Sequence, residues 1–138
     1  MRPTLLLLCT LLLSACASTP PTAQLQGEVF YLQRIALPAD AELTVTLEDI
    51  SLADAPALEL ARQQQASGGR QVPLPFSLVY SPSTVKPGHR YAVRARIEAG
   101  GQLLWVNTDQ HSVALDGHDP QPLRIRVNPV HTPESVIH

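Results

Sequence analysis

The sequence alternates strictly between apolar and polar residues along Leu43-Thr44-Val45-Thr46-Leu47-Glu48. Successive side chains of a β-strand point to opposite faces, so this period of two predicts a half-buried strand. We expect Leu43, Val45 and Leu47 to face a core. Such a strand needs a second layer that covers its apolar face.

The same alternation returns downstream, in Tyr91-Ala92-Val93-Arg94-Ala95-Arg96-Ile97 and in Leu123-Arg124-Ile125-Arg126-Val127. In both segments the apolar side chains are expected to face the core and the arginines to point outward. Gly100-Gly101, which is typical of a tight hairpin, precedes a further strand over Leu103–Asn107. Residues 129–138 have no periodicity and are predicted to be a disordered tail.

An edge strand is predicted over Val72-Pro73-Leu74-Pro75-Phe76-Ser77-Leu78-Val79-Tyr80. Its apolar residues alternate as a core face, and Pro73 and Pro75 lie on the other parity. Residues of one parity point their amides to the same edge, so that edge lacks two donors in succession. We therefore expect no strand to pair there, which protects the chain against association through this edge.

The first strand is predicted over Gly27–Leu32, which is rich in β-branched and aromatic residues. Its buried face stays open, because Val29 and Tyr31 compete with Phe30 and Leu32.

Helix and strand signals conflict over residues 54–66. Asp54 resembles a helix N-cap and Pro56 fits a first helical turn. Against a helix, Leu58 and Leu60 stand two apart with little else apolar, so a helix would have almost no face to bury. We predict a short strand that runs into a polar loop at Gln63-Gln64-Gln65.

Seven short strands separated by turn signals, with no convincing helix, predict an all-β fold: one antiparallel β-sandwich. The sandwich domain is expected to span residues 27–128, with no second domain and no internal repeat.

The amino-terminal residues have the three-part pattern of a secretory signal peptide. Met1-Arg2 is positive, Leu5–Leu13 is apolar, and small residues precede Cys16. The apolar run is too short to span a bilayer, which needs about 20 residues. Leu13-Ser14-Ala15-Cys16 resembles the bacterial lipobox, which implies that residues 1–15 are removed and Cys16 is lipidated. Residues 16–26, which are small, polar and proline-bearing, are expected to form a flexible tether.

Charge and motif content argue against several classes of function. The chain carries 10 basic and 12 acidic side chains, whereas nucleic-acid binding favours a basic surface. Neither of the two cysteines remains free in the predicted mature domain. No phosphate loop, His-Glu-x-x-His, Gly-x-Ser-x-Gly or dinucleotide motif is present. We expect a protein that is not an enzyme and that has no cofactor.

Several segments together resemble the YbaY/YscW family of bacterial lipoproteins. The resemblance is carried by the segments 27–41, 45–51 with 53–57, 73–76, 91–97 and 101–104, in that order. It implies a compact β-sandwich, of immunoglobulin- or prealbumin-like type, on a lipid anchor. The best described members are type III secretion pilotins, which escort a secretin subunit to the outer membrane. Because Ala17 rather than aspartate follows Cys16, the lipobox resemblance implies an outer-membrane anchor that faces the periplasm.

Four residues are candidates for binding a protein partner. Trp105 is the only tryptophan and could anchor a partner, as could Tyr31, although core packing is the more common role of such residues. Arg94 and Arg96 could form a basic strip with Arg124 and Arg126, or be paired with neighbours such as Glu48 or Glu98.

A different class of function is a periplasmic module that binds a small ligand or metal. Its motivation is a cluster of possible metal ligands: Asp109, His111, Asp116, His118 and Asp119. The cluster matches no zinc or calcium spacing, so no metal site is expected.

Overall fold

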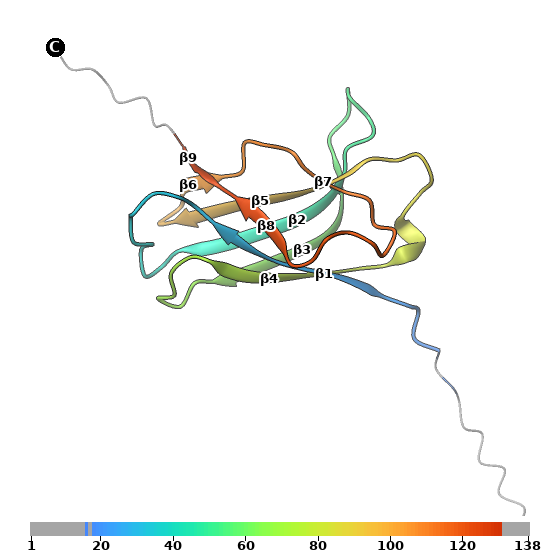
Figure 1. Cartoon of the computed structure of the whole chain (residues 1–138), viewed down its shortest axis with the longest axis horizontal. Helices are drawn as coiled ribbons and strands as arrows, with labels where there is room; N and C mark the ends of the chain where they lie inside the picture. Colours follow the sequence, from blue (N-terminus) through green and yellow to red (C-terminus); the bar gives the residue numbers. More distant parts are fainter. Residues whose placement is uncertain (1–15, 17, 131–138) are drawn as a thin grey trace, which may run out of the picture.

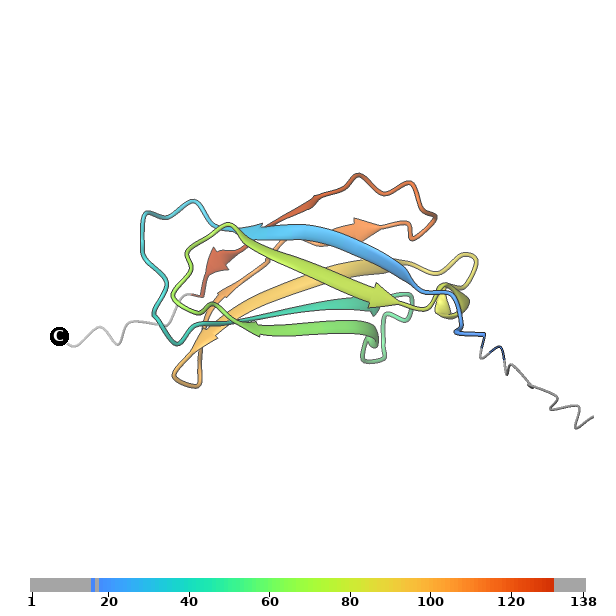
Figure 2. The same cartoon turned by 90° about the horizontal axis from the view of Figure 1, so that it is seen from below.

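The computed structural model describes Cys16 and residues 18–130. The predicted signal peptide and most of the predicted tail, residues 131–138, lie outside the described residues. Two β-sheets pack face to face, and the chain enters the sandwich at one end and leaves it at the other (Figures 1 and 2). Within the described part, the one helical element is a 3-10 turn, η1 (Pro82–Thr84), and no helix could span a membrane.

The described residues form nine strands: β1 (Ala23–Phe30), β2 (Glu42–Asp49), β3 (Leu58–Ala66), β4 (Leu74–Tyr80), β5 (Tyr91–Ala99), β6 (Gln102–Val106), β7 (His111–Val113), β8 (Leu123–Arg126) and β9 (Asn128–Pro129). The three-stranded sheet has the order β4-β1-β8. The six-stranded sheet has the order β3-β2-β5-β6-β9, with β7 also paired to β5.

The all-β sandwich is therefore confirmed, but its pairing is not entirely antiparallel. β1 and β8 run parallel, because the chain crosses from β7 in one sheet to β8 in the other and enters β8 from the end where β1 also begins. The two strands missing from the sequence prediction, β7 and β9, have three and two residues, too few to show a period.

The core lies between the sheets and follows the predicted alternation. In β2, the side chains of Leu43, Val45 and Leu47 are at most 1% exposed. β5 pairs with β2 and also points alternate residues, from Tyr91 to Ile97, into the core. Full burial of one such aliphatic side chain stabilises the fold by about 1.5–3 kcal/mol.

β1 begins at Ala23, four residues before the predicted domain boundary at Gly27. The predicted tether over residues 16–26 is therefore too long, since Leu25 is buried against β4 and only 2% exposed. Because polar glutamines flank Leu25 on both sides, the sequence does not predict a strand at these residues. The open question about the buried face is also settled: Val29 and Tyr31 point inward, whereas Leu32 is 61% exposed.

β3 is a strand, as predicted, but Gln63-Gln64-Gln65 belongs to it rather than to a loop. All three glutamines pair with β2. Residues with good helix propensity form a strand here because pairing with β2 and capping of β4 outweigh that weak local preference.

β4 is an edge strand, which confirms the argument from Pro73 and Pro75, and it pairs with β1 alone. Two glutamine side chains of β3 close its outer edge. The backbone N–H of Ser77 donates to Oε1 of Gln63 at 2.7 Å. Nε2 of Gln65 donates to the carbonyl oxygen of Pro75 at 2.6 Å. These two hydrogen bonds occupy outward backbone groups of β4 that a further strand would need.

The predicted end of the domain at residue 128 is slightly too early. Pro129 pairs with Trp105 in the β6–β9 ladder, and the N–H of Val130 donates to the carbonyl oxygen of Leu104 at 2.9 Å. Residues 129 and 130 therefore belong to the sandwich and not to the tail.

Candidate functional site

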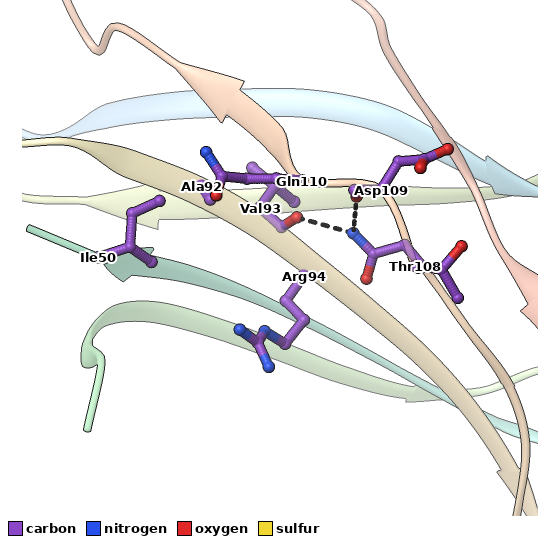
Figure 3. Close-up of a pocket in the computed structure, with 8 residues that line it drawn as sticks. Ile50, Ala92, Val93, Arg94, Thr108, Asp109 and Gln110 are labelled. Carbon is purple, nitrogen blue, oxygen red and sulfur yellow. Dashed lines mark hydrogen bonds between the residues drawn. The ribbon is translucent and has the colours of Figure 1, made fainter. Parts of the chain in front are cut away.

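A shallow hollow opens on the outer face of the six-stranded sheet, where β6 and β7 share β5 as their neighbour (Figure 3). β7 pairs with Tyr91–Val93, and β6 pairs with Arg96–Ala99. Neither strand pairs with the two residues of β5 between these ranges, so the ladder is interrupted on this edge.

Asn107 fills the interruption in the ladder. Its side-chain oxygen accepts a hydrogen bond from the N–H of Ala95 at 2.9 Å. Its side-chain nitrogen donates to the carbonyl oxygens of Val93 at 3.1 Å and Asp109 at 3.3 Å. No motif or period in the sequence predicts this role of Asn107. Asparagine's tendency to bond to backbone groups is the one signal that points to it.

The hollow has a volume of about 220 Å³ and lies over the outer surface of β5. Its lining consists of Ile50, Ala92, Val93, Arg94, Asn107, Thr108, Asp109 and Gln110. A second depression, of about 320 Å³, shares Ile50, Arg94 and Gln110 with it. The loop after β2 walls this second depression and includes Leu52, which is 71% exposed. The two hollows together present exposed apolar side chains beside an arginine.

A hydrogen-bonded carboxylate fixes the rim next to Ile50. Asp49 accepts the N–H of Ser51 at 2.9 Å and contacts Nδ1 of His89 at 2.6 Å. Hydrogen bonds from Ser51 and then from His89 lower the pKa of Asp49 to about 2. Ser51 in turn accepts the N–H of Arg90 at 2.8 Å, which ties the end of β2 to the start of β5.

Arg94 and Arg96 point outward, and each pairs with a predicted neighbour. Nε of Arg94 lies 3.1 Å from Glu48, and Nε of Arg96 lies 3.2 Å from Glu98. Exposed pairs of this kind add at most about 1 kcal/mol each. The four outward arginines do not form one strip, because Arg124 and Arg126 lie on the other sheet.

Tyr31 and Trp105 are core residues. Both are 6% exposed, and their rings stack with centroids 4.6 Å apart and an interplanar angle of 8°. The hydroxyl of Tyr31 donates to the carbonyl oxygen of Ile35, and burial raises the pKa of this tyrosine. The stack joins the end of β1 to β6, and so links the two sheets. Tyr31 and Trp105 therefore pack in the core, as the alternative interpretation of the sequence had it. Neither ring is a surface anchor in this conformation.

Two carboxylates of the Asp109 to Asp119 cluster, Asp116 and Asp119, organise the backbone of their own loop. The carboxylate of Asp119 accepts the N–H groups of Ala114 at 2.7 Å and Leu115 at 2.8 Å. Asp116 accepts the N–H of His118 at 2.8 Å. Among the residues that the structure describes, no three His, Cys, Asp or Glu side chains are placed to hold a metal ion.

The fold and surface define a small β-sandwich domain whose candidate site is an exposed surface rather than a deep cavity. The family model for the type III secretion system lipoprotein chaperone YscW matches residues 20–125. The chain belongs to the YscW family.

Two related proteins extend this result. The chain is 37% identical over 107 residues to YbaY, an uncharacterised lipoprotein of Escherichia coli K12, covering 75% of this chain and 56% of YbaY. It therefore spans little more than half of that relative. It is also similar to the solved structure of an alternative pilotin from the type II secretion system of Vibrio cholerae. That match has a TM-score of 0.76 and 40% identity, and covers 81% of this chain and 100% of the other.

Proposed function

We propose that this protein is a pilotin-like lipoprotein, which binds a secretin subunit and escorts it to the outer membrane without catalysing a reaction. The observation that carries the proposal is the similarity to the Vibrio cholerae pilotin, whose whole resolved chain is covered at 40% identity. Membership of the YscW chaperone family supports the same role.

The proposed anchor is a lipid on Cys16, which would hold the domain on the periplasmic face of the outer membrane. Several acyl chains, each worth about 0.8 kcal/mol per buried methylene, give stable anchoring. Cys16 is exposed, and β1 begins at Ala23. The tether is thus residues 16–22, which at about 3 Å per residue reach roughly 20 Å. The bound partner would therefore be held close to the bilayer.

The first test follows the secretin in cells. The gene is replaced by the wild-type chain, by Cys16→Ala, or by a deletion, and the secretin subunit is measured in inner- and outer-membrane fractions. We expect outer-membrane secretin with the wild type alone, and crosslinks from the wild-type protein to the secretin. Unchanged secretin localisation and assembly after deletion would contradict the escort role.

On the domain surface, we propose that Arg94 and Arg96 contact the partner, while Tyr31 and Trp105 support the fold from within. Arg94 lines the hollow and is 64% exposed at its side chain, so a partner reaches it directly. The double variant Arg94→Ala/Arg96→Ala is expected to weaken binding to the secretin without unfolding the domain. The matched control is Arg70→Ala, which removes an arginine of the β3–β4 loop. If Arg94→Ala/Arg96→Ala and Arg70→Ala bind the secretin equally well, Arg94 and Arg96 do not contact the partner.

A further inference from the structure

Within the part of the chain that the structure describes, the outer edge of β8 carries backbone groups that pair with no other strand. The N–H of Val127 donates to the carbonyl oxygen of Phe30 in β1 at 2.9 Å. Because backbone groups alternate in direction along a strand, Leu123 and Ile125 also face β1. The N–H and C=O groups of Arg124 and Arg126 therefore point to the other side, where β8 pairs with no strand of the described chain.

This edge differs from the opposite edge of the same sheet. β4 lies across β1 from β8 (Figure 1), and its outer edge is blocked by Pro75 and by the side chains of Gln63 and Gln65. No proline lies within β8, and no side chain of the described residues caps the outward groups of Arg124 and Arg126. Natural proteins usually protect edges that must stay unpaired, so the contrast marks β8 as available for pairing.

A hollow lies beside this edge, between β8 and β7. It has a volume of about 330 Å³, and its lining includes Val113, Pro120, Pro122 and Leu123. The rest of the lining is polar or charged and consists of His111, Ser112, Asp119 and Arg124. A strand added to β8 would turn every second side chain inward, toward the apolar part of this lining. Alternate apolar residues on an incoming segment are therefore accommodated.

The arginines beside the edge determine which residues are favoured at the outward-facing positions of an added strand. Arg124 is 63% exposed at its side chain and pairs with Glu28 at 3.0 Å, also lying over the ring of Phe30. Arg126 is exposed and has no ion pair within the described residues. Residues directly opposite on a neighbouring strand have their side chains on the same face, where opposite charges attract.

The same charges disfavour a second copy of this chain as the occupant. Antiparallel pairing of β8 with β8 of another copy would place the arginines of the two copies opposite one another. Like charges in directly opposed positions are destabilising, so these arginines act against self-association.

We propose that β8 receives an extended segment of the protein partner as an added strand, with acidic residues opposite Arg124 and Arg126 and apolar residues between them. Main-chain hydrogen bonds then supply affinity, and the alternating side chains supply specificity. The inference rests on the proposed function only for the choice of a secretin as the source of the segment.

The test uses overlapping peptides that cover the host's secretin subunit and the full chain purified in detergent. Binding is titrated, and amide hydrogen exchange is read at each residue with and without peptide. The expected binder alternates apolar and acidic residues and slows exchange of the Arg124 and Arg126 amides by at least about tenfold, because those amides gain hydrogen bonds.

Matched variants separate the contribution of the backbone N–H of Arg126 to peptide binding from that of its side chain. Arg126→Pro removes the outward N–H and should weaken binding at least about tenfold, whereas Arg126→Thr keeps the amide and should weaken it less. Val79→Pro, at the outer edge of β4, should leave binding unchanged. If Arg126→Pro unfolds the domain, the hydrogen-exchange measurement on the wild type still tests whether a strand is added to β8.

Three outcomes would overturn the inference. One is a peptide that binds while the Arg124 and Arg126 amides exchange as in the free protein. Another is protection of these amides without peptide in a dimeric sample, which would assign the edge to a second copy. The third is no peptide binding although secretin localisation depends on the protein in cells. That last result would leave the proposed function standing.

Discussion

At the scale of single residues, Gly27 has no room for a side chain between its neighbouring strands. A Cβ there would lie 2.5 Å from the carbonyl oxygen of Leu123 and 2.6 Å from the ring of Phe76. The absence of a side chain therefore lets β8 and β4 both approach β1.

We predict that Gly27→Ala destabilises the domain by about 1–3 kcal/mol, the usual effect of overpacking. Urea denaturation followed by fluorescence measures it. The control is Gln26→Ala, which changes an exposed neighbour. Equal midpoints for the two variants would mean that the strands move apart without cost.

Asp49 provides a pH-dependent contribution to stability. Its pKa is lowered from 3.8 to about 2 in the folded chain, so the folded state favours the ionised carboxylate. The contribution is complete above the pKa of the unfolded chain and is lost as the pH falls through the folded pKa.

We therefore predict that the stability difference between the wild type and Asp49→Asn is largest near neutral pH and shrinks between about pH 5 and 2. Urea midpoints across that range test this, with Asp54→Asn as the control in the neighbouring loop. A difference that stays constant down to pH 2 would show that the carboxylate's charge is not the cause.

At the scale of elements, the edges of the sandwich are controlled by side chains from other strands. Gln63 and Gln65 of β3 satisfy backbone groups of β4 in the opposite sheet. The sequence marks β4 as an edge through its prolines, but nothing local to β3 indicates that its glutamines are the caps.

Replacing Gln63 by alanine should cost about 0.5–1.5 kcal/mol, since the N–H of Ser77 loses its partner. We also expect faster hydrogen exchange at the Ser77 amide. Gln64→Ala is the control, because Gln64 bonds instead to Glu42 on the outer surface. An unchanged Ser77 exchange rate in Gln63→Ala would show that this amide does not depend on the cap.

At the scale of the whole molecule, the domain begins at Ala23 rather than at Gly27. Two truncations test this boundary. A chain that starts at Thr22 keeps all of β1 and should unfold at the same urea concentration as the chain that starts at Cys16.

A chain that starts at Gly27 loses Leu25, which is 2% exposed, and the pairing of the first half of β1 with β4. It should be less stable by at least about 2 kcal/mol. Equal stability of the two truncated chains would support the tether over residues 16–26 that the sequence predicts.

Local patterns were sufficient where one face of a strand is apolar over several residues. The alternation in Leu43–Leu47 and Tyr91–Ile97 determined the inward faces of β2 and β5, and the parity of Pro73 and Pro75 determined that β4 lies at an edge. These features depend on the direction in which neighbouring side chains and amides point, which the chain itself fixes.

Only the tertiary structure decided which distant segments meet. It paired β8 with β1 in parallel, stacked Tyr31 on Trp105 inside the core, and placed the outward arginines on two separate faces. It also joined Asn107 to the interrupted edge of β5. Each of these contacts joins residues far apart in sequence or on different strands, and no local period carries information about the partner across the sandwich.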